Sequence, residues 1–113
     1  MSATPPAYTK TVSVTVSGGT VVCTPDTVDV THANTLVVFT LDTPNYTFPS
    51  SGAIVVTTTN TDFPYASWTT GPHQAAIFDA KAVNGNYKYS ATVLDSSGTP
   101  ISNDPVIHNT VPA

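Results

Sequence analysis

The sequence predicts an all-β domain built as a two-sheet antiparallel sandwich, and three observations lead to this prediction. Thr and Val dominate, whereas Leu occurs three times and Glu and Arg are absent. β-Branched residues suit a pleated surface, and good helix formers are correspondingly scarce. Ten prolines and six glycines separate short apolar runs. These runs recur with turn residues roughly every 8–12 residues, a spacing typical of sandwiches.

We expect residues 1–8 to be a flexible, Pro-rich lead-in and residues 9–113 to form a single domain. At 113 residues the chain has room for one core. The eight predicted strands cover residues 11–16, 20–23, 27–31, 35–41, 53–59, 73–80, 86–95 and 104–111.

Period-two alternation is the clearest indication for several of these strands. Val12, Val14 and Val16 should share one inward face of the first strand. A similar inward set is predicted for residues 86–95, and it comprises Tyr87, Tyr89, Ala91 and Val93. Residues 35–41 are apolar almost throughout, which favours a central strand.

The charge balance excludes several partner classes. Seven Asp and three Lys residues give a formal net charge of −4, so the chain lacks the basic footprint that nucleic acid or anionic lipid requires.

No run approaches the roughly 20 apolar residues of a membrane span. The given chain begins without a secretory signal pattern, and a single cysteine suits a reducing compartment, so we expect a cytoplasmic protein.

Three segments carry a resemblance to a known family. The stretches "TPDTVDVTHANTLVVFTL", "GPHQAAIFDA" and "GNYKYSA" follow one another in the chain, and together they resemble a cupredoxin. The ending "NDPVIHN" is similar to the small bacterial DP-EP family of cupredoxin-like proteins. This resemblance implies a Greek-key sandwich of two sheets.

The resemblance does not extend to the family's copper ligands. A type 1 site needs a thiolate and two imidazoles, usually with a weak axial thioether. His73 stands where the first imidazole would be, but Ala91 replaces the thiolate, and residues 92–105 contain neither His nor Met. We therefore expect no copper site and no other cofactor.

An immunoglobulin-like sandwich is the alternative fold. Gly85, Asn86 and Tyr87 resemble the tyrosine corner of such domains, in which the hydroxyl group anchors nearby backbone. Their inter-sheet disulfide is impossible here, because Tyr89 stands where the second cysteine would be.

Other chemistry-bearing residues fall into no catalytic motif, so we predict that the protein is not an enzyme. Cys23 follows two valines and should be a core residue, unrelated to His32 in the next turn. His73 and His108, with Asp104, are an alternative set of ligands for a redox-inactive metal ion. The turn-like sequence contexts of five aspartates predict solvated side chains. These are Asp26, Asp42, Asp62, Asp95 and Asp104.

The long irregular stretch at residues 60–72 carries Phe63, Tyr65 and Trp68. Long loops with aromatic residues often serve as binding surfaces. We therefore predict that these three residues bind a protein partner or mediate self-association. In a carbohydrate-binding alternative, Trp68 and Tyr65 stack on sugar rings. A purely structural alternative has Phe63 and Trp68 folded back as a lid over one end of the core.

Overall fold

Ten strands make up the part of the chain that the computed structural model describes, which comprises residues 8–58, 62–63, 65–80 and 84–110. They are β1 (Tyr8–Ser17), β2 (Thr20–Thr24), β3 (Thr27–Val30), β4 (Thr35–Leu41), β5 (Ile54–Val56), β6 (Trp68–Gly71), β7 (Gln74–Asp79), β8 (Gly85–Leu94), β9 (Pro100–Asn103) and β10 (Val106–Asn109). These residues contain no helix, so no helix that could span a membrane is found among them. The all-β prediction is confirmed.

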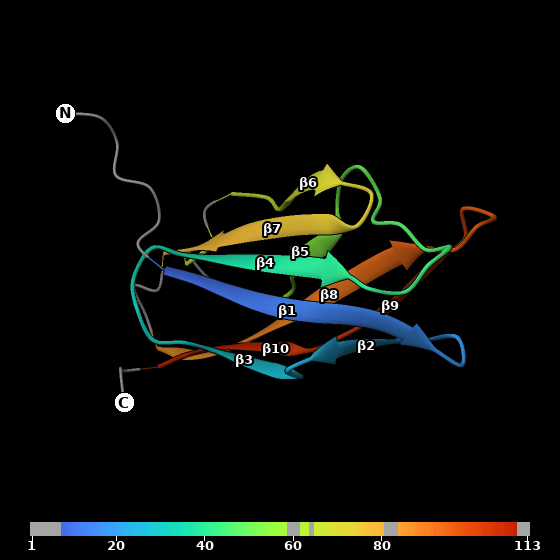
Figure 1. Ribbon diagram of the computed structural model, residues 1–113. Coiled ribbons are helices and arrows are strands. Elements are labelled where there is room, and N and C mark those ends of the chain that lie inside the picture. The colour runs from blue at the N-terminus through green and yellow to red at the C-terminus, as the bar shows by residue number, and fades with distance from the viewer. Residues whose placement is uncertain (1–7, 59–61, 64, 81–83, 111–113) are drawn as a thin grey trace.

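The strands form two layers (Figure 1). The first sheet has the order β2-β1-β4-β7-β6, and the second has the order β3-β10-β8-β5, with β9 also pairing with β8. Both sheets are mixed, because β1 runs parallel to β4 and β10 runs parallel to β3. The prediction of purely antiparallel sheets is therefore wrong. β1 and β4 run parallel because the chain leaves the first sheet after β2, passes through β3 in the second sheet, and returns as β4 beside β1.

Alternation along the strands builds the core, as the sequence predicted. Val12 and Val14 are buried and Val16 is partly buried. All four predicted residues of β8 are buried. Across the gap between the sheets, the rings of Phe39 and Tyr89 meet edge to face with their centroids 5.4 Å apart. Desolvation by burial is the main cause that raises the pKa of Tyr89, and the neighbouring Cys23 raises it further.

Two strands were not predicted, and both are short and polar. β6 lies inside the stretch expected to be irregular, and β9 lies between the predicted strands at residues 86–95 and 104–111, where no strand was expected. Neither has apolar alternation, so each depends on backbone pairing with a longer neighbour, β7 and β8 respectively. Of the predicted lead-in, residues 1–7 lie outside the described residues, and Tyr8 already belongs to β1.

Cys23 is a core residue, as predicted, and closes one flank of the sandwich where β2 meets β9. Its side chain is 3% exposed, and its Sγ lies 3.8 Å from Oδ1 of Asn103. The Asn103 amide in turn donates to the Val21 carbonyl oxygen at 2.7 Å. His32 lies elsewhere, after β3, where its Nδ1 is 3.0 Å from Thr31 Oγ1. The cysteine and the histidine therefore make no common site.

We expect Cys23 to react slowly with a thiol reagent in the folded protein and quickly in denaturant. Burial raises the pKa of its thiol, so a pH of about 9 should speed the reaction of the unfolded chain far more than that of the native protein. In urea unfolding, Cys23→Ala should cost about 1 kcal/mol. Cys23→Ser should cost more because it buries a hydroxyl group. Fast labelling of the native protein would contradict the assignment.

Candidate functional site

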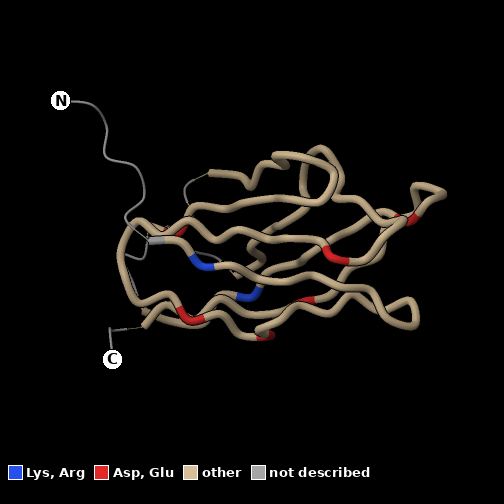
Figure 2. Tube along the Cα trace, viewed as in Figure 1, with Lys and Arg blue, Asp and Glu red and all other residues tan. Residues whose placement is uncertain are grey.

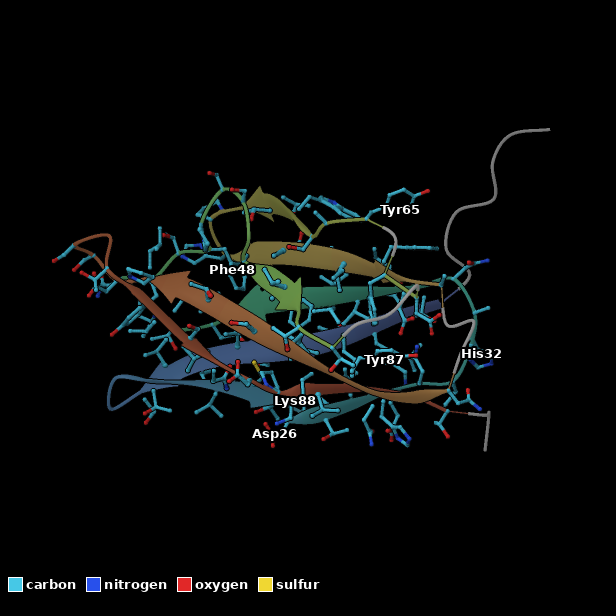
Figure 3. All side chains as sticks on the ribbon, turned by 180° about the vertical axis from the view of Figure 1, so that it is seen from behind. Asp26, His32, Phe48, Tyr65, Tyr87 and Lys88 are labelled. Carbon is cyan, nitrogen blue, oxygen red and sulfur yellow. The ribbon has the colours of Figure 1, made fainter. Side chains whose placement is uncertain are left out.

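The three aromatic residues predicted as a binding surface take different positions. Phe63 is partly buried against the core, and its ring meets that of Tyr87 edge to face at a centroid distance of 5.5 Å. Tyr65 is 65% exposed and Trp68 is 42% exposed. Figure 3 shows Tyr65 at the outer margin of the molecule. Phe63 thus serves as the lid of the structural alternative, while Tyr65 and Trp68 face solvent. Asn60, Thr61 and Pro64 of the same stretch lie outside the described residues.

A buried polar cluster anchors this segment to both sheets. Asn109 on β10 donates through Nδ2 to Asp62 Oδ2 at 2.9 Å and to Asp79 Oδ1 at 3.0 Å. The Tyr87 hydroxyl on β8 also donates to Asp62 Oδ2, at 3.3 Å. The backbone amide of Ala80 donates to the carbonyl oxygen of Asp62 at 2.8 Å. One loop residue is therefore tied to β7, β8 and β10.

The prediction that Asp62 is a solvated turn residue is wrong. Asp62, Asp79 and Asn109 are each 0% exposed. Sequence reasoning missed the cluster because its members are distant in the chain and only the fold brings them together. The available indication was that Asn109 lies two residues after Ile107 in the predicted strand, so both side chains should point inward. Tyr87 is also used differently from the predicted tyrosine corner, since its hydroxyl reaches a side chain 25 residues away. Desolvation by burial is the main cause that raises the pKa of Tyr87, and the nearby Asp62 raises it further.

Trp68 and Tyr65 border an extended surface that we call the outer face, namely the side of the first sheet that points away from the core. Its residues stand opposite one another in four rows across the strands. The rows consist of Thr9, Leu36 and Phe78; Thr11, Val38, Ala76 and Trp68; Thr24, Ser13, Thr40 and Gln74; and Val22 and Thr15. Except for Ala76, all of them are exposed or partly exposed. Tyr65 extends the first row, because its ring centroid lies 6.1 Å from that of Phe78.

The outer face contains no charged side chain. Within the five strands of the first sheet, the formal charges belong to Lys10 and Asp79 alone. Lys10 stands opposite the core residue Val37, and Asp79 is buried, so both lie on the other side of the sheet. Figure 2 shows long stretches of β1, β4 and β7 without charged positions. Asp42 lies at the rim, where its Oδ2 accepts a hydrogen bond from Ser13 Oγ at 2.6 Å.

A cavity of about 270 Å³ opens at one flank of the sandwich, between β5 and the segment that carries the aromatic residues. Ile54 and Ile77, both buried, belong to its lining, together with Phe63 and Tyr65. Ser67 Oγ accepts a hydrogen bond from the Ile54 amide at 3.2 Å and so ties the two sides of the opening.

The alternative metal ligands are not brought together. His73 directly precedes β7, and His108 lies beside Asn109, whose amide reaches Asp79 at the last residue of β7. The six residues of β7, about 20 Å of strand, separate the two ends. His108 Nδ1 instead lies 3.1 Å from Asp29 Oδ1, and Asp104 is exposed between β9 and β10. Among the described residues, no group of three or more metal-binding side chains is found.

Comparison with known proteins adds no relative. No protein-family model matches the sequence, and no curated protein matches it.

Asn109→Asp should destabilise the protein strongly, because it replaces the bridging amide by a third buried carboxyl group. We expect a loss of roughly 3 kcal/mol or more at neutral pH. Burial and two carboxyl neighbours raise the pKa of the new group, so the loss should shrink as the pH falls towards about 4. Asn86→Asp, on an exposed part of β8, is the matched control and should change stability by about 0.5 kcal/mol at most. Equal losses in urea unfolding would refute the bridge.

Phe63→Ala should cost about 2–3 kcal/mol of stability, whereas Trp68→Ala should cost about 1 kcal/mol, because only Phe63 packs on the core. The single tryptophan allows a direct check of exposure. Iodide should quench the fluorescence of Trp68 in the native protein, and this quenching should be an appreciable fraction of that measured in denaturant. A shielded Trp68 with a large folding effect would restore the lid interpretation for that residue.

Proposed function

We propose that this chain is a non-catalytic, cupredoxin-like protein-binding module whose binding surface is the outer face together with Tyr65. The observation that carries the proposal is the absence of charge across the four rows of that face. Cores of protein interfaces are depleted in charged residues and enriched in aromatic ones. The outer face has both properties, with Phe78 and Trp68 on the sheet and Tyr65 beside them.

Support for the cupredoxin-like part comes from the sequence segments that resemble that family. They lie in β3 and β4, in β7, and in β8, and each of the two layers contains two of these strands. A Greek-key connection of these strands belongs to the same proposal.

The polar groups favour binding over catalysis. The buried polar cluster built on Asp62, Asp79 and Asn109 is closed to solvent. A catalytic group must touch its substrate, and these side chains have no exposed surface with which to do so. The exposed imidazoles of His73 and His108 lie near opposite ends of β7.

A carbohydrate-binding role is the second candidate, and the exposure of Tyr65 and Trp68 favours it. Aromatic rings offer a broad apolar face on which a sugar ring can stack. Retention of the protein on microcrystalline cellulose or chitin, lost in Trp68→Ala, would favour this role over protein binding.

A charge placed in the outer face tests the proposed function. Thr11 on β1 and Thr27 on β3 are both exposed threonines on strands, but only Thr11 belongs to the outer face. Immobilised wild type, Thr11→Lys and Thr27→Lys proteins should be incubated with extract of the cells that make the chain. We expect proteins identified by mass spectrometry to be retained by wild type and Thr27→Lys, and at least tenfold less by Thr11→Lys. Equal retention by all three would contradict the proposal.

A further inference from the structure

We infer that the partner of the outer face is a second copy of this chain, packed sheet against sheet around a two-fold axis; this inference rests on the proposed function. The charge distribution is the first argument. Each copy carries a formal net charge of −4, so two copies repel one another through most of their surfaces. Like charges placed in contact oppose association. The outer face lets two copies meet without any such contact.

The distribution of side-chain size across the sheet is the second argument. β4 is the central strand in the order β2-β1-β4-β7-β6. On one side of it the outer face carries the large rings of Phe78 and Trp68, and on the other side it carries small residues such as Thr9 and Thr11. The face is therefore high along one edge and low along the other.

A two-fold axis that runs parallel to β4, midway between the two faces, matches these two halves. Such an axis places β7 of one copy over β1 of the other, so that Phe78 of each copy meets Thr9 of the other. It places Trp68 of each copy beside Thr11 of the other, past Thr24, where β2 ends. This self-complementarity is what an isologous dimer interface requires. Val38 on β4 lies in the row of Trp68 and faces its own counterpart near the axis. Stacked sheets pack in this way about 10 Å apart.

The area of the face sets the strength of the contact. With strands about 4.8 Å apart and outward residues about 6.8 Å apart along each strand, the face covers on the order of 500 Å². A standard protein interface removes roughly 800 Å² from each partner. The outer face with Tyr65 is thus at the small end of the range, which predicts a reversible dimer whose population rises with concentration.

A charge-pair experiment at Val38 tests the two-fold arrangement. Sedimentation equilibrium of the wild type over about a hundredfold range of concentration should show a monomer–dimer equilibrium. Val38→Lys and Val38→Glu should each weaken dimerisation at least tenfold, because each places like charges opposite one another. An equimolar mixture of the two variants should regain dimerisation. Val55 on β5 is 48% exposed and lies in the second sheet, so Val55→Lys and Val55→Glu are matched controls that should dimerise as the wild type does.

Each outcome decides between alternatives. A wild type that stays monomeric, or a dimer that survives both Val38 variants, would overturn the inference. If a Val38 variant loses its β-sheet circular dichroism, Thr11→Lys, at an exposed site of the same row, should still weaken dimerisation because it places a charge against the uncharged face of the other copy. A monomer whose retention of extract proteins still depends on Thr11 would leave the proposed function standing with another partner. A monomer that is retained on cellulose or chitin would replace both by carbohydrate binding.

Discussion

The carboxamide of Asn109 makes the contact on which the arrangement of the other elements depends. Through one amide nitrogen it joins Asp62 in the loop to Asp79 on β7, and its own strand belongs to the opposite sheet. Carboxyl groups away from water are costly unless hydrogen bonds compensate them. The bridge therefore favours one specific relation between the layers, because a shift of either sheet would break hydrogen bonds that buried groups cannot replace with water. Phe63 and Tyr65 take their positions from this anchor.

The outward surfaces of the two sheets differ in charge, and this difference follows from the residues on their strands. The first sheet presents β-branched and aromatic side chains outward, whereas the second presents polar residues such as Asp29, Lys88 and His108. Threonine explains how an uncharged sheet can stay in water: its methyl group suits a pleated surface and its hydroxyl group remains hydrated. Because the outer face carries no charged side chain, nothing on it opposes contact with a second uncharged surface.

Local pattern predicted most of this fold and little of the candidate site. The buried faces of β1 and β8 could be predicted from the alternation of Val12, Val14 and the apolar residues of β8, because a period of two leaves one side of a strand apolar. β6 and β9 did not, since a strand held by backbone pairing leaves no hydrophobic trace in the sequence. Asp62 reads as a turn residue for the same reason, because its burial depends on Asn109, 47 residues away. The aromatic content of the loop predicted a binding surface at Tyr65 and Trp68 but left a buried Trp68 as an alternative. The four rows that extend from these residues required the strand register.

The two flanks of the sandwich differ in how tightly they are filled. Where β2 meets β9, Asn103 and Cys23 close the gap with direct contacts. Where β5 faces the aromatic segment, about 270 Å³ remains open, and a hydrogen bond to Ser67 spans the opening. Solvent reaches the side chains of an open pocket but not those of a filled gap. Amide hydrogens on the β5 flank are therefore expected to exchange with solvent sooner than those on the β2 flank.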